Sequence, residues 1–301
     1  YAKNVYTNEG GSKLTTDENG YVIYTDGDEK ILVAYTGTET ELTLPSDITK
    51  IYLHAFYDCS RLTSITIPDS VMSIGYEAFY NCTGLTSVTI GNGVTSIGDY
   101  AFRNCHGLTS VTIGDGVTSI GINAFYDCDK LQDIYITDIA AWCNISGLDN
   151  LMEYGASNKK LYINNELATL ITIPDGVTAI PNYAFRNCSG LTSVTIPDSV
   201  TSIGNWAFYD CSRLTSITIP DSVTGIGDYA FYNCRGLTSV AIGNSVTVIC
   251  YQAFYNCYRL IEVYNKSTLS ITAGSSSNGY VARYAKNVYT NEGGSKLTTD
   301  E

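Results

Sequence analysis

The amino-acid sequence predicts an α/β solenoid with one parallel concave sheet of about ten strands, short helical turns on the convex side and an N-terminal hairpin cap. First, the dipeptide Ala-Phe recurs every 23 residues within each of two blocks. Second, a Cys follows each of these Phe residues three positions later. Third, a short alternation of apolar and hydroxyl residues precedes each pair, which favours a strand. The Phe residues of these pairs are all the Phe of the chain: Phe56, Phe79, Phe102, Phe125, Phe185, Phe208, Phe231 and Phe254.

One unit, which begins at Leu62, shows how the turn of the solenoid is built. Ile65 and Ile67 fall on one side of the expected strand, and Ser64 and Thr66 fall on the other. Pro-Asp-Ser then turns the chain, and the Ala-Phe-x-x-Cys spacing suits a single helical turn. A lone unit would not fold, because ordering its residues costs about twice what its own burial returns. Strands are expected to begin near Glu41, Leu62, Leu85, Leu108, Leu131, Ala168, Leu191, Leu214, Leu237 and Leu260.

The repeated run Leu-x-x-Ile-x-Ile-Pro-x-x-Val-x-x-Ile-Gly-x-x-Ala-Phe-x-x-Cys resembles the BspA-like leucine-rich repeat family of microbial surface and secreted proteins. The resemblance covers roughly residues 39–266. The chain departs from the pattern at Cys250, where other units have Gly, and at Gly91, Gly114 and Gly243, which replace Pro. The resemblance implies an extracellular or cell-surface location and attachment to host proteins or other cells.

The solenoid of residues 39–266 is expected to have distinct flanking segments and one irregular unit. In the N-terminal segment 1–38, a hairpin around Asp26–Glu29 would cap the first strand. In the irregular unit 131–167, Asp138 could cap a short helix, and Asn164-Asn165 could turn a second hairpin. This unit is either a protruding ligand loop or an insertion that closes over its own core. In the segment 267–301, Val281, Tyr284, Ala285 and Val288 recur at helical spacing, which predicts a short amphipathic helix.

The last 18 residues, 284–301, repeat residues 1–18 identically. We expect that the chain derives from a longer protein with tandem copies of this module, so that neighbouring modules could make head-to-tail contacts. We also expect the two identical segments to be ordered differently, because only the C-terminal copy follows the intact helix.

The Cys column favours a ladder of reduced, buried thiols over disulfides or metal ligands, because no C-x-x-C pair occurs and free Cys packs as a small hydrophobe. No cofactor or metal is expected, and the Asp and Asn residues of the turns are interpreted as turn chemistry, not as calcium ligands. Cys143 and Cys250 lie outside the column and could be reactive if exposed. The structural core is expected to include Phe79, Phe102, Phe125, Phe185, Phe208, Phe231, Cys82, Cys105, Cys211 and Cys234.

Two surfaces are candidates for ligand contact. The open face of the sheet carries Ser and Thr, and Tyr and Trp gather on the opposite side of each turn. The hydroxyl residues could bind glycans or a peptide, or could simply suit a solvated strand; the aromatic residues could form an interface or pack against one another. The candidate contact residues are those that break the hydroxyl pattern or lie in the insertion: Asp133, Tyr135, Trp142, Tyr154, Leu170, Glu262 and Tyr264.

These features favour a non-enzymatic binding scaffold. The net charge of −13 would repel nucleic acid and anionic membranes, and no apolar stretch is long enough to be inserted in a bilayer. No nucleophile elbow or phosphate-binding loop occurs, and His54 and His106 fall in different columns of the repeat. The leading function is adhesion to host or cell-surface proteins. The alternatives are a glycan-binding module and a structural spacer in a tandem-repeat surface protein.

Overall fold

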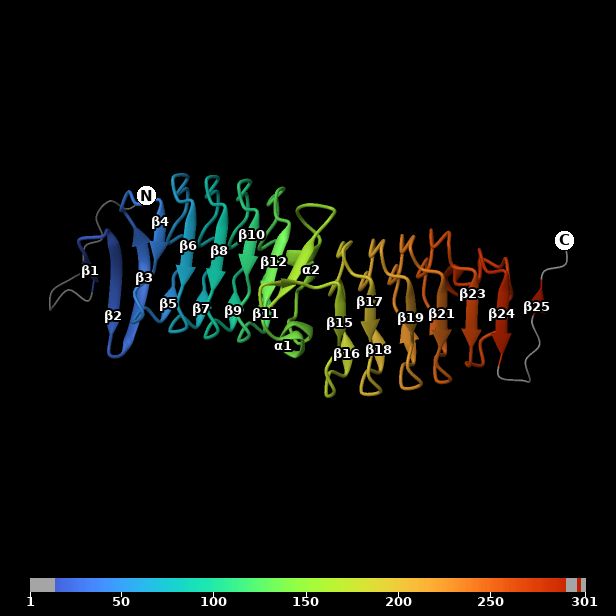
Figure 1. Cartoon of the computed structure of the whole chain (residues 1–301). Helices are drawn as coiled ribbons and strands as arrows, with labels where there is room; N and C mark the ends of the chain where they lie inside the picture. The colour runs from blue at the N-terminus through green and yellow to red at the C-terminus, as the bar shows by residue number, and fades with distance from the viewer. Residues whose placement is uncertain (1–13, 291–296, 299–301) are drawn as a thin grey trace. The chain divides into compact units, whose positions relative to one another are not determined.

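The computed structural model describes residues 14–290 and 297–298. The predicted solenoid of parallel strands is confirmed. The chain forms two compact units, of which the first contains residues 1–137 and 154–156, and the second contains residues 138–153 and 157–301. Figure 1 shows the turns of each unit following one another along the chain.

In the first unit, the first strand of each turn pairs in parallel with that of the next, with a shift of 23 residues. These strands are β4 (Glu41–Thr43), β6 (Ser64–Ile67), β8 (Ser87–Ile90), β10 (Ser110–Thr112) and β12 (Asp133–Ile136). Each turn also has a second, two-residue strand, and these strands form another parallel sheet. They are β5 (Lys50–Ile51), β7 (Ser73–Ile74), β9 (Ser96–Ile97) and β11 (Ser119–Ile120). The predicted parallel sheet is thus confirmed in the first strands, and the second row of short strands is an addition that the sequence did not indicate.

The N-terminal cap is the antiparallel hairpin of β2 (Tyr21–Asp26) and β3 (Glu29–Tyr35), preceded by β1 (Leu14–Thr16). Strand β3 pairs in parallel with β5, which places the hairpin next to the second strand of the first turn. The expected hairpin is confirmed, and its connection to the repeats is through the row of short strands.

The second unit begins with two short helices, α1 (Ile139–Cys143) and α2 (Asp149–Met152), and the hairpin of β13 (Lys160–Ile163) and β14 (Glu166–Leu167). As expected, the Asp138 carboxylate caps α1 by accepting bonds from the backbone N–H groups of Ala140 and Ala141, at 2.6 and 2.9 Å. The hairpin turn has positive φ at Asn164 and Asn165, 52° and 66°.

The turns that follow again have two parallel rows. Their first strands are β15 (Leu170–Thr172), β17 (Ser193–Thr195), β19 (Ser216–Thr218), β21 (Ser239–Ile242) and β23 (Glu262–Asn265). They form two parallel groups, β15–β17 and β19–β21–β23. Their second strands are β16 (Ala179–Ile180), β18 (Ser202–Ile203), β20 (Gly225–Ile226) and β22 (Val248–Ile249).

The C-terminal end differs from the expected helix. A 3-10 turn, η1 (Asn278–Tyr280), is followed by strand β24 (Asn287–Thr290), which pairs in parallel with β23, and by β25 (Leu297–Thr298). The side chain of Val288 is fully buried within this strand, so the helical spacing of apolar residues was misleading. A strand buries alternate residues, and parallel pairing with β23 outweighed the short local periodicity.

The Ala-Phe segments are hydrogen-bonded turns, not the helical turns expected. The physical reason is the backbone on both sides of each pair. In one repeat, Tyr100 has φ 58° and Asn104 has φ 62°, and equivalent positions of the other repeats are also left-handed. An L-residue in this conformation interrupts a right-handed helix. The segment is held instead by ladder bonds, such as that from the backbone N–H of Phe102 to the carbonyl of Ala124 in the next turn, 2.8 Å long.

Candidate binding surface

The core ladder keeps the surface columns in register. In each unit, successive Phe rings stack with centroids between 4.7 and 5.3 Å apart. Six of the eight ladder thiols, all except Cys59 and Cys188, donate to the carbonyl of the Phe one turn earlier, as Cys211 does to Phe185 at 3.1 Å. All ten of the predicted core residues are fully buried. Equivalent surface side chains therefore recur at the spacing of the strands.

The cysteines are free thiols, and their surroundings do not favour thiolates. Burial raises the pKa of Cys143 and of Cys188 to about 12, and it also raises the pKa of the half-buried Cys250. Because the thiolate is the reactive form of cysteine, these raised pKa values favour the unreactive thiol; at Cys188 the burial outweighs the opposing charge of Lys159.

Hydroxyl side chains recur in several columns of the repeat, and the columns differ in their bonding. Most Thr residues that come just before a first or a second strand donate to the equivalent carbonyl one turn earlier; Thr215, for example, donates to Thr192 at 3.3 Å, and Thr224 donates to Thr201 at 3.2 Å. The hydroxyls on the first strands themselves make no hydrogen bond within residues 14–290 and 297–298. We call these side chains the hydroxyl face of each unit: Ser64, Thr66, Ser87, Thr89, Ser110 and Thr112 in the first unit, and Ser193, Thr195, Ser216, Thr218 and Ser239 in the second.

The candidate contact residues on the first strands lie at the ends of the hydroxyl face. In the first unit, Asp133 and Tyr135 are half-buried on β12, in register with Ser110 and Thr112. In the second unit, Leu170 is 70% exposed on β15. On β23, Glu262 is half-buried and accepts a bond from the Tyr264 hydroxyl at 3.0 Å. The Tyr264 ring, 41% exposed, stacks on Tyr289 of β24.

The candidates in the insertion do not form a protruding ligand loop. Trp142 is only 1% exposed, and its indole N–H donates to the carbonyl of Ala184 at 3.0 Å, so it packs in the interior of the second unit. Tyr154, in the first unit, donates its hydroxyl to Asn123 at 2.8 Å and packs edge-on against Tyr126. The interpretation that the insertion closes over its own core therefore holds for Trp142, which is not available to a ligand.

The aromatic side chains of the turns form stacked rows. In the second unit, Trp206 lies between Tyr183 and Tyr229, with centroids at 5.9 and 4.3 Å. The guanidinium of Arg186 lies 5.2 Å from the centroids of both Trp206 and Tyr209 and 3.5 Å from the Glu153 carboxylate. Much of the aromatic surface is thus engaged in packing within the chain.

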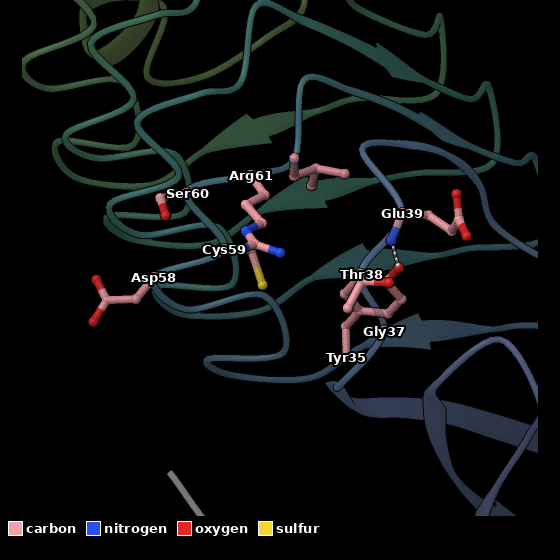
Figure 2. Close-up of a pocket in the computed structure, with 9 residues that line it drawn as sticks. Tyr35, Gly37, Thr38, Glu39, Asp58, Cys59, Ser60 and Arg61 are labelled. Atoms are coloured by element: carbon pink, nitrogen blue, oxygen red, sulfur yellow. Dashed lines mark hydrogen bonds between the residues drawn. The ribbon is translucent and has the colours of Figure 1, made fainter.

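A cavity that the sequence did not indicate lies between the N-terminal hairpin and the first repeat. It has a volume of about 300 Å³ and is lined by Tyr35, Glu39, Cys59, Arg61 and their neighbours (Figure 2). Its contacts are modest: the Tyr35 hydroxyl accepts a bond from the backbone N–H of Glu39 at 3.1 Å, and burial raises the pKa of Cys59 to about 12. The sequence did not predict this cavity, because its lining comes from two separate segments, the end of the hairpin and the first repeat.

Metal binding and membrane insertion have little structural support in the part of the chain that the structure describes. No group of three or more His, Cys, Asp or Glu side chains there could hold a metal ion. The two His residues each face a carboxylate of the next turn, His54 with Glu77 at 2.9 Å and His106 with Asp129 at 3.1 Å. Among the described helices, none has the length and apolarity needed to cross a membrane.

Stacked 23-residue turns with two rows of parallel strands define a leucine-rich repeat solenoid, a class of repeat scaffold with extended surfaces. The chain belongs to the family described as the BspA type leucine-rich repeat region, whose model matches six copies over residues 34–144 and 158–277. Repeats of this family form a fold that is typically non-enzymatic.

Two solved structures are similar to this chain, and the first of them shows the same fold. A leucine-rich repeat protein from Bacteroides ovatus matches 94% of this chain and 76% of its own, with a TM-score of 0.54 and 24% identity. A leucine-rich cell surface protein from Faecalibacterium prausnitzii matches 96% of this chain and 98% of its own, with a TM-score of 0.43 and 25% identity. A comparison with curated proteins found no match.

Proposed function

We propose that this chain is a non-enzymatic, extracellular adhesion scaffold that attaches to host or cell-surface proteins through its hydroxyl face. The observation that carries the proposal is the contrast between the two hydroxyl columns. Thr192 and Thr215 bond the backbone of the preceding turn, whereas neighbouring Thr195 and Thr218 are exposed without an internal partner. Hydroxyls that are left to solvent are available to donate to and accept from a bound polypeptide.

The electrostatics of this face support the same proposal. The chain has 30 acidic and 17 basic residues, yet the ionisable side chains on the open face of the first strands, Glu41, Asp133 and Glu262, lie on β4, β12 and β23, and the strands between them present Ser and Thr. An uncharged face avoids much of the long-range repulsion that a chain of net charge −13 exerts on acidic partners. Leu170 and Tyr264, exposed at its two ends in the second unit, add the apolar area that interface cores require. The resemblance to a family of surface and secreted proteins supports the proposed extracellular location.

The test introduces charge on the hydroxyl face and measures attachment. A triple variant, Thr195→Lys, Ser216→Lys and Thr218→Lys, places three cations on β17 and β19. A control, Thr201→Lys, Thr224→Lys and Thr247→Lys, adds the same charge at exposed Thr residues just before β18, β20 and β22. Each of these Thr donates to a carbonyl one turn earlier, so the control also measures the effect of losing three such bonds. Labelled chains are titrated onto intact host cells, onto those cells after protease treatment, and onto a glycan array.

We expect saturable binding to untreated cells that protease abolishes, a loss of at least tenfold in affinity for the hydroxyl-face variant, and no change for the control. Binding that survives protease and is competed by a soluble sugar would replace this proposal with a glycan-binding module. Absence of binding on all three surfaces would refute an adhesive role and leave the spacer interpretation. Equal losses in both variants would refute the assignment to this face.

A further inference from the structure

The last turn of the second unit is completed by a strand whose sequence occurs twice in the chain. Strand β24 lies within residues 284–301, which are identical to residues 1–18. It pairs in parallel with β23 over four residues, Glu262 to Asn265 against Asn287 to Thr290. The segment 4–7 of the chain therefore has the same sequence, Asn-Val-Tyr-Thr, as the strand that covers β23.

The backbone of β24 continues the ladder of the repeats although the 23-residue spacing has ended. The N–H groups of Lys286 and Asn287 both donate to the carbonyl of Ile261, at 2.9 and 3.1 Å. In the preceding turn, the N–H groups of Ile261 and Glu262 donate to Thr238 in the same way, at 3.0 and 3.2 Å. The edge of β23 thus accepts N–H donors from β24 in the same register that the preceding turns use.

The side chains that fix β24 on this edge belong to the duplicated sequence. Val288 is fully buried and Ala285 is 6% exposed. Tyr289 stacks on Tyr264 with centroids 4.8 Å apart, and Tyr284 packs edge-on against Tyr258 at 5.1 Å. The first copy supplies identical residues at these four positions, namely Tyr1, Ala2, Val5 and Tyr6.

We propose that the edge of β23 is a docking site for a second copy of this chain. Residues 4–7 of one molecule take the place of Asn287–Thr290 of another, so that the two join head to tail. The proposal is independent of the adhesive function. Two side chains next to this edge, Tyr258 and Ile261, are 53% and 39% exposed, and a docked neighbour would cover part of them.

The strands next to the duplicated segment are compatible with such a joint. Leu297–Thr298 of β25 pair antiparallel with β24, and the identical residues Leu14–Thr15 of β1 pair antiparallel with β2. An incoming copy would therefore place its own hairpin, β2 and β3, beside the strand that it docks. In the intact chain, the tethered C-terminal copy competes at an effective concentration on the order of millimolar, so it keeps the edge occupied at micromolar protein.

The test removes the competing copy within the full-length chain. Val288→Asp puts a charge at a fully buried position of β24 and opens the β23 edge. Val5→Asp is the matched control, because it changes the same residue in the other copy. We expect the Val288→Asp chain to form dimers and larger species whose mean mass at least doubles as the concentration rises. The Val5→Asp chain and the double variant should remain monomeric by analytical ultracentrifugation.

A synthetic peptide of residues 1–18 provides the direct measurement. It should bind the Val288→Asp chain at least tenfold more tightly than the intact chain, and the same peptide with Val5→Asp should bind neither. The double variant should still bind the unaltered peptide. Circular dichroism checks the fold; if Val288→Asp loses its strand signal, the same readouts are taken on Val288→Ala. Oligomers of equal size in the single and double variants, or equal binding of both peptides, would overturn the proposal.

Discussion

Substitution of one ring in the middle of the Phe ladder should destabilise the second unit strongly. Phe208 is fully buried, and its ring stacks on Phe185 at 5.3 Å and on Phe231 at 5.1 Å. Phe208→Ala should cost about 3–5 kcal/mol in unfolding free energy, since truncation of a buried Phe leaves a cavity. Phe254→Ala, at a ring with one stacked Phe neighbour, should cost about 0.5–1.5 kcal/mol less, the value of one aromatic pair.

The assay is urea unfolding followed by far-UV circular dichroism, with Tyr251→Ala as the control. Tyr251 is 59% exposed, and its truncation should change stability by less than about 0.5 kcal/mol. Hydrogen exchange should place the loss of protection of Phe208→Ala in the neighbouring turns, because each repeat is stabilised mainly by its neighbours. A cost below about 1 kcal/mol for Phe208→Ala, or one equal to that of Tyr251→Ala, would refute the argument that stacked interiors hold the turns together.

Three further outcomes are expected. Trp142→Phe should destabilise the second unit by about 1–3 kcal/mol, measured by thermal unfolding, because the Ala184 carbonyl loses its indole donor in a buried site; no change would contradict that bond. Arg186→Met should cost about 2 kcal/mol, because the guanidinium contacts with three rings and with Glu153 are lost, and Arg186→Lys should recover part of that loss. Folding raises the pKa of Cys188 from 9.0 to about 12, so the stability that its buried thiol contributes is complete below about pH 9 and declines above it by about 1.4 kcal/mol per pH unit. Between pH 8 and pH 10, the urea midpoint of Cys188→Ala should therefore fall less than that of the unaltered chain. Equal declines in the two chains would contradict this assignment.

The repeated core was predictable because its signal is periodic. Each Phe, Cys and Ile recurs at 23 residues, and only stacking can bury a column of that kind. The hairpin cap and the Asp138-capped helix were also predictable, since both depend on local turn and capping chemistry. These features need no knowledge of which distant segments meet.

The errors concern places where local pattern and long-range pairing compete. The second strand of each turn has only two residues, such as Ser73–Ile74. A run of two residues is too short to show the alternation of apolar and polar residues that predicts a strand. Val288 fits a helical spacing but lies in a strand, because the β23 edge offered it a parallel partner. Trp142 looked like a surface anchor in an irregular stretch, yet its ring is buried against a turn 42 residues away in sequence.

The stacking of equivalent residues in successive turns also determines how the length of such a molecule can change. A whole 23-residue turn inserted into either unit would extend it by one step of about 4.8 Å and would offer its neighbours the same carbonyls, thiol and ring that they already bind. A partial turn would instead break both strand rows at once, since each row depends on the same spacing. Growth and shrinkage of the array are therefore confined to whole repeats, and the reach of the surface is set in discrete increments.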